Sequence, residues 1–117
     1  MTRHLLALDG GNSKTDVLLL TADGTVVARA RAGSFAPHIV GAEAAVAGLA
    51  AAVAEALGSG GIERADLVAG YLANADLPEE EEAIAAAITA HGWGDHVIVE
   101  NDTHAMLRAG TDAAVAV

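Results

Sequence analysis

The stretch LALDGGNSKTDVLLL, residues 6 to 20, decides the fold and raises the first question about function. An apolar run ends at Asp9 and two glycines, a short polar string follows, and a second apolar run begins at once. Two strands joined by a tight turn fit this pattern. Because glycine has no side chain, the same turn lets an anion approach the backbone N–H groups closely. The pattern leaves two interpretations open: a glycine turn capped by an aspartate, or a loop that holds phosphate.

A P-loop is excluded for this stretch. That motif requires glycine directly before the lysine and another glycine five residues earlier, but Ser13 and Leu8 stand at these positions. A P-loop also leads into a helix, whereas Lys14 leads into an apolar strand. In a phosphate-binding hairpin, Asp9 would hold Mg²⁺, usually through water, because its own charge repels phosphate. The phosphate-binding residues would then be those that follow it: Gly10, Gly11, Asn12, Ser13, Lys14 and Thr15.

Further along the chain, short apolar runs alternate with segments of helical periodicity, which is typical of an α/β fold. We expect a three-stranded meander followed by two crossover units, that is, a mixed five-stranded sheet with helices on its faces. The predicted strands are His4–Leu8, Thr15–Thr21, Thr25–Ala32, Leu67–Ala73 and His96–Val99, with a further one starting at Ala113–Val117. The predicted helices cover Ala42–Leu57, the segment from Pro78 to a stop at Gly92, and Thr103–Ala109, while residues 33–41 form a loop.

Polar residues follow several of these strands at the edge of the sheet where ligands collect, beyond the carboxyl ends of the strands. Asp9 ends the first strand and Asp102 follows the fifth, so we expect both at this edge. Asp102 either caps the helix that starts near Thr103 or accepts the hydroxyl proton in a phosphoryl transfer, and one side chain can do both. Asn74, after the fourth strand, reaches the same cleft or caps a turn.

Composition narrows the class of protein. The 117 residues suffice for one domain with a real core, and a net charge of −10 argues against nucleic acid or an anionic membrane surface as the main partner. The chain has no cysteine, so it holds no disulfide and no thiolate metal site. We find no signal-peptide pattern and no apolar run near the roughly 20 residues of a membrane span, and we expect a soluble cytoplasmic protein.

Taken together, these motifs resemble the actin-like ATPases with a ribonuclease-H-like fold, and among them the BadF/BadG/BcrA/BcrD ATPase family, which includes N-acetylglucosamine kinase and glucosamine kinase. The resemblance is carried by the segment from Asp9 to Asp16 after a strand and by Asn101-Asp102 after the fifth strand. The Leu77-Pro78 helix start and Gly92-Trp93 after that helix also fit. The resemblance covers the whole of this chain, but it corresponds only to the first of the family's two domains. It implies that residues 1–112 form that first domain and that residues 113–117 open the second.

The resemblance also implies an activity: transfer of phosphate from ATP, with Mg²⁺, to a hydroxyl of an amino sugar. Asp102 would be the catalytic base, and Asn101 and Asn74 would line the substrate site. The loop at 33–41 often contributes to the sugar site, but related kinases carry an asparagine where this chain has Pro37. Whether His38 binds sugar or packs in the loop is therefore open.

Two alternatives remain at this stage. Some members of the family are ATPases that drive electron transfer in an acyl-CoA reductase or dehydratase system, with a cysteine-bound iron–sulfur cluster, and the 117 residues contain no cysteine. The other alternative is a non-catalytic protein that binds sugar or nucleotide. Whether the protein is a kinase or a binding protein, we expect an amino sugar and a nucleotide as its partners. The sequence leaves open whether the protein forms a homodimer.

Overall fold

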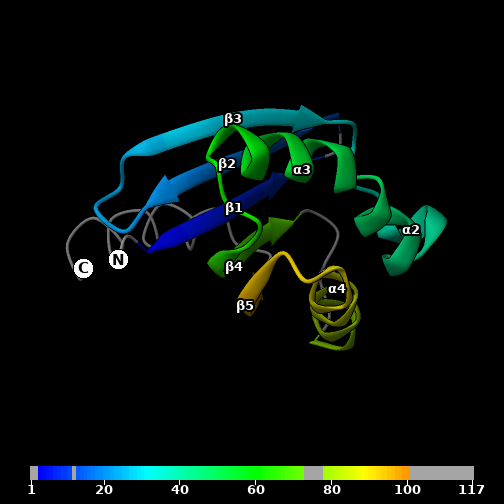
Figure 1. The fold of residues 1–117 in the computed structure, drawn as a ribbon. Helices are drawn as coiled ribbons and strands as arrows, with labels where there is room; N and C mark the ends of the chain where they lie inside the picture. Colours follow the sequence, from blue (N-terminus) through cyan, green and yellow to red (C-terminus); the bar gives the residue numbers. More distant parts are fainter. Residues whose placement is uncertain (1–2, 12, 73–77, 101–117) are drawn as a thin grey trace.

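A computed structural model describes residues 3–11, 13–72 and 78–100 (Figure 1). Five strands form one mixed sheet in the order β3-β2-β1-β4-β5, in which β1 and β2, and β2 and β3, pair antiparallel, whereas β1 and β4, and β4 and β5, pair parallel. This is the predicted meander followed by two parallel crossovers. The strands are β1 (His4–Gly10), β2 (Thr15–Thr21), β3 (Val26–Ala32), β4 (Ala65–Leu72) and β5 (Gly94–Glu100).

The helices of the described part lie on one face of this sheet (Figure 1). They are α1 (Pro37–Val40), α2 (Ala42–Ala47), α3 (Ala50–Ser59) and α4 (Pro78–His91). Helix α3 contacts β2 and β3, while α4 contacts β5 and α2. Helix α4 begins at Pro78, carries Glu79–Glu81 in its first turn and ends before Gly92, whose φ of 69° is a left-handed conformation. Both ends match the prediction from the sequence.

The main core lies between the sheet and these helices. Strand alternation sends Leu6, Leu8, Val17 and Leu19 to the helix-covered face, where all four are fully buried. The opposite face carries a smaller apolar cluster of Ala69 and Tyr71, with Leu5 packed against it. On the helix side these strand residues meet the predicted apolar stripes: Val46, Leu49, Val53, Leu57, Ile84 and Ile88.

The predicted single helix over Ala42–Leu57 is two helices, which corrects the prediction. The break falls at Gly48 and Leu49, where Gly48 is a poor helix former and the Leu49 N–H donates to the Val46 carbonyl oxygen at 2.9 Å. Apolar spacing continues across the break, so Leu49 is still buried. By length and composition alone, Ala42–Ser59 is apolar enough to span a membrane. Because one side of this stretch is buried against the sheet, it is the core segment of a globular domain.

Several further boundaries differ from the prediction: β3 begins one residue later than predicted, and β4 and β5 each begin two residues earlier. Strand β1 runs two residues past Leu8, because Asp9 and Gly10 continue the antiparallel ladder opposite Asp16 and Thr15. The expected loop at 33–41 contains the short helix α1, which begins at its proline. The helix predicted at Thr103–Ala109 and the strand predicted at Ala113–Val117 lie outside the described residues.

Candidate functional site

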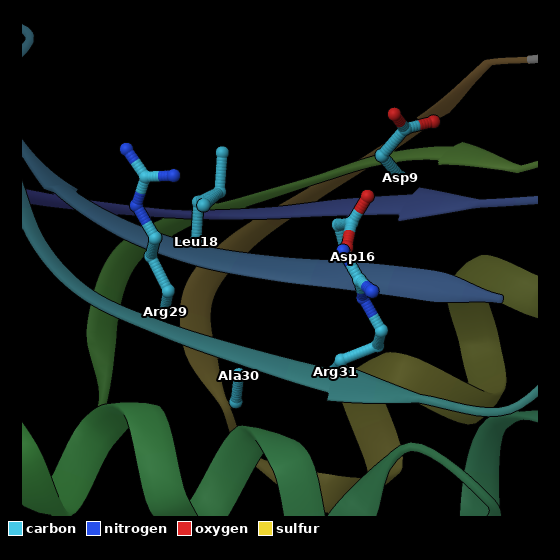
Figure 2. Close-up of a pocket in the computed structure, with 6 residues that line it drawn as sticks. All are labelled: Asp9, Asp16, Leu18, Arg29, Ala30 and Arg31. Carbon is cyan, nitrogen blue, oxygen red and sulfur yellow. The ribbon is translucent and has the colours of Figure 1, made fainter.

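A groove of about 430 Å³ opens beside Asp9, on the face of the sheet that the described helices leave uncovered (Figure 2). Figure 2 shows the side chains of Asp9, Asp16, Leu18 and Arg29 rising from this face, and Arg31 turned toward Asp16. The groove lies over β1, β2 and β3 at the end of β1. Its lining residues are Asp9, Asp16, Leu18, Arg29, Ala30 and Arg31.

Asp9 is partly buried at the carboxyl end of β1, next to the parallel strand β4. Its register partners are Asp16 on β2 and Tyr71 on β4. Burial raises the pKa of the Asp9 carboxyl above its ordinary value of 3.8, the charge of Asp16 raises it further, and Lys14 opposes both effects. The fold therefore places a carboxylate that a nearby cation would stabilise at the ligand edge of the sheet.

The turn between β1 and β2 is closed by its own backbone. The Gly11 N–H donates to the Lys14 carbonyl oxygen at 2.8 Å, so in this structure that donor is engaged within the turn. Gly10 is buried, and a Cβ at this position would lie 2.6 Å from Leu72 Cδ2 and 3.0 Å from Phe35 Cβ. Close packing thus accounts for Gly10 without any ligand.

The remaining described residues of the predicted phosphate loop differ in their exposure. Ser13 and Lys14 are exposed, and the Lys14 ammonium lies 3.7 Å from Asp16 Oδ2. Thr15 is fully buried on the helix-covered face, where its hydroxyl donates to the Gly33 carbonyl oxygen at 2.9 Å. The structure therefore brings Asp9 and Lys14 together and turns the Thr15 side chain away from them. Asn12 lies outside the described residues.

Of the four residues predicted to bind sugar, the structure describes only His38. His38 is exposed on α1 and does not line the groove beside Asp9. A second, smaller hollow of about 230 Å³ lies between α1 and α4 and includes Pro37 and Ile84. The other three predicted residues, Asn74, Asn101 and Asp102, lie outside the described residues.

Sequence reasoning did not assign a role to Asp16, Arg31 or Phe35. The Arg31 Nε donates to Asp16 Oδ1 at 3.0 Å, and this hydrogen bond, more than any other contact, lowers the pKa of Asp16. Phe35 is fully buried and its N–H donates to the Gly11 carbonyl oxygen at 3.0 Å. The alternation of Arg29 and Arg31 along β3 was the available signal for the first contact. No comparable signal marks Phe35.

No family model matches the sequence, and no curated protein matches it significantly. Solved structures do match. A candidate N-acetylglucosamine kinase from Porphyromonas gingivalis superposes with a TM-score of 0.66 at 21% identity over 81% of this chain and 33% of that one. Another from Chromobacterium violaceum gives a TM-score of 0.65 at 20% identity over 92% of this chain and 39% of that one.

A third solved structure is component A of the (R)-2-hydroxyglutaryl-CoA dehydratase from Acidaminococcus fermentans, with a TM-score of 0.50 at 18% identity. The match covers 93% of this chain and 35% of that one. The match thus spans between 33% and 39% of the length of these three proteins. At such identities the likeness establishes the fold. The described part of the chain has the α/β, ribonuclease-H-like fold of the actin-like ATPases and sugar kinases.

Proposed function

We propose that this chain belongs to an ATP-dependent kinase that phosphorylates an amino sugar, N-acetylglucosamine or glucosamine, in the cytoplasm. One observation carries the proposal. Asp9 ends β1 beside a tight glycine turn and an open groove, in a fold shared with two candidate N-acetylglucosamine kinases. Phosphoryl transfer depends mainly on positioning and charge stabilisation, and this edge of the sheet offers a carboxylate, a lysine and a turn for that purpose.

The residues beside Asp9 fit Mg²⁺. This ion keeps several of its waters and is usually held by one or two carboxylates together with phosphate oxygens. Asp9 lies opposite a second carboxylate, Asp16, and a cation placed there would relieve their mutual repulsion. When bound with ATP, Mg²⁺ neutralises charge on the transferring phosphate. The chain's own contribution is the Asp9 carboxylate and, from the exposed part of the turn, the Ser13 hydroxyl and the Lys14 ammonium.

The sugar side of the proposal rests on Asp102, which would accept the proton of the attacking hydroxyl, with Asn74 and Asn101 as substrate contacts and His38 as a further one. The phosphate side needs a second domain. We propose that residues 1–112 form one domain and that 113–117 begin another, which would supply a second phosphate loop and the adenosine pocket. The span of about a third of the matched kinases supports this division.

The test is a coupled assay of ADP release by the full-length protein, including any sequence beyond Val117, with ATP, Mg²⁺ and a panel of amino sugars. We expect sugar-dependent turnover, and we expect Asp102→Asn to lower kcat by about 10² to 10⁴ while sugar binding is largely kept. Residues 1–117 alone should not turn over, because one phosphate loop does not position the transferred group. A variant that keeps more than about a third of the wild-type kcat would limit Asp102 to a helix cap.

The second candidate is an ATPase that activates a dehydratase, and the likeness to the Acidaminococcus component supports it. Its TM-score of 0.50 is lower than the values of 0.66 and 0.65 for the two kinases. ADP release that is independent of every sugar, with iron and sulfide bound to the full-length protein, would favour this candidate over the kinase.

A further inference from the structure

Three charged residues stand in one row across the groove. In the register of the sheet, Asp9 on β1 is opposite Asp16 on β2, and Asp16 is opposite Arg31 on β3 (Figure 2). Directly opposite side chains on antiparallel strands interact, and like charges in such a pair repel. The pairing of Asp9 with Asp16 is thus unfavourable by itself, whereas that of Asp16 with Arg31 is favourable.

Asp16 uses both of its carboxylate oxygens. Oδ1 accepts the hydrogen bond from Arg31 Nε at 3.0 Å, and Oδ2 lies 3.7 Å from Lys14 Nζ. Its side chain is 33% exposed, against 51% for Lys14 and 64% for Arg31, so the carboxylate is the least exposed of the three groups. Arg29 lies in the same groove and adds another cation. Asp16 therefore stands between the carboxylate of Asp9 and the cations that would attract phosphate.

We propose that Asp16 is a specificity-determining residue that makes the groove accept a phosphate chain only together with a divalent cation. The inference rests on the proposed nucleotide-binding function. With Asp16 present, the carboxylates of Asp9 and Asp16 offset two of the three cations Lys14, Arg29 and Arg31, and a bare polyphosphate meets two carboxylates. With a cation bound to the phosphate chain, the carboxylates become attractive partners and Lys14 remains within reach of phosphate oxygens.

Removal of the Asp16 charge should therefore weaken this discrimination. In Asp16→Asn the groove would carry one more net positive charge than in the wild type, and metal-free ATP should bind more tightly while Mg-ATP gains little. The quantity to measure is the ratio of the Kd for ATP in excess EDTA to the Kd for ATP in excess Mg²⁺. We expect this ratio to fall by about three- to tenfold, because the groups are solvent-exposed and the effect of one charge is screened.

The chain offers a matched control. Asp95 also forms an exposed ion pair, with Arg64 at 3.0 Å, but it lies at the start of β5, at the edge of the sheet away from Asp9. Asp95→Asn should leave the ratio within about twofold of the wild-type value. A second variant gives the opposite sign: Arg31→Gln keeps the Asp16 charge and removes its partner, so the ratio should rise.

The measurement is isothermal titration calorimetry on the full-length protein at fixed ionic strength. A falling ratio in Asp16→Asn, an unchanged one in Asp95→Asn and a rising one in Arg31→Gln support the inference. If Asp16→Asn does not fold, the sign of the Arg31→Gln effect decides, and an unchanged or lower ratio overturns the inference. A wild-type protein that binds Mg-ATP while neither groove variant alters the ratio overturns this inference alone. A wild-type protein that binds no form of ATP overturns the proposed function as well.

Discussion

Phe35 donates its backbone N–H to the carbonyl oxygen of Gly11 at 3.0 Å, which ties the segment after β3 to the turn between β1 and β2. The Phe35 side chain is fully buried and lies beside Gly10. The turn that we assign to phosphate is thus supported from below by an aromatic ring of the core. This relationship connects the stability of the fold with the geometry of the candidate site.

Phe35→Ala should lower the free energy of unfolding by about 3–5 kcal/mol, because it leaves a cavity beneath the turn. Urea denaturation followed by circular dichroism measures the change. Ile39→Ala is the control, since Ile39 is 74% exposed on α1 and its loss should stay within about 0.5 kcal/mol. A loss below about 1 kcal/mol for the Phe35 variant would show that the ring does not support the turn.

Gly10→Ala should destabilise the protein by about 1–3 kcal/mol, because the new methyl group would meet Leu72 at 2.6 Å and Phe35 at 3.0 Å. Gly58→Ala is the matched control: Gly58 lies in α3 with nothing within 4 Å of an added Cβ. That change should stabilise the protein by about 0.4–1 kcal/mol. Thermal unfolding of both variants measures the difference. Equal shifts in Tm for the two variants would show that close packing does not explain the glycine at position 10.

Asp9→Asn should stabilise the ligand-free protein at neutral pH. The pKa of Asp9 is raised by burial and by Asp16, so the folded state holds the protonated form longer than the unfolded state does. Its contribution to stability is thus lost as the pH rises from the ordinary value of 3.8 through the raised folded value. Asp9→Asn has no carboxylate at this position, so its free energy of unfolding should fall less over that pH range than that of the wild-type protein. Urea titrations at several pH values measure both.

Asp16→Asn should have the opposite effect on stability. Its hydrogen bond from Arg31 lowers the pKa of Asp16, so the carboxylate stabilises the fold above 3.8 and this contribution is lost as the pH falls through the lowered folded value. For an exposed pair the loss at neutral pH should be at most about 1 kcal/mol. If urea unfolding at pH 7 ranks Asp9→Asn below Asp16→Asn in stability, the assigned charge balance is wrong.

Asp23 should titrate at unusually low pH. Its carboxylate accepts hydrogen bonds from the Thr21 hydroxyl and from the Thr25 N–H, the latter at 3.0 Å, and these contacts lower its pKa. Carboxyl carbon shifts in an NMR titration should give a midpoint below 3.8 for Asp23 and above 3.8 for Asp9. Reversed midpoints would contradict the hydrogen-bonded turn between β2 and β3.

The strands could be predicted from the sequence because each is a short local run of mainly apolar residues, with alternation in the segment that forms β3. The bounds of β2 agree with the prediction, and the crossover order follows from the buried run that forms β4. The break at Gly48 could not be predicted from apolar spacing, because the spacing continues through it. Sheet register is a tertiary property, and the irregularity between Leu19 and Leu20 on β2 shifts the pairing with β3.

Part of the geometry beside the groove follows from the sequence. Asp9 and Lys14 were identified from the turn, and the structure brings them close to one groove. The sequence predicts a phosphate contact for Thr15, which follows Lys14, but strand alternation turns the Thr15 side chain toward the core, as a period of two indicates. The ion pair of Asp16 with Arg31 joins residues 15 positions apart and depends on the register of β2 and β3.

We propose that the chain serves phosphoryl transfer to an amino sugar. The most direct test is phosphorus NMR of the full-length protein, including any sequence beyond Val117, incubated with ATP, Mg²⁺ and N-acetylglucosamine or glucosamine. We expect a new phosphomonoester resonance that grows with ADP, requires both the sugar and Mg²⁺, and is lost in Asp102→Asn. ADP that forms with inorganic phosphate and without a phosphomonoester for any amino sugar would contradict it.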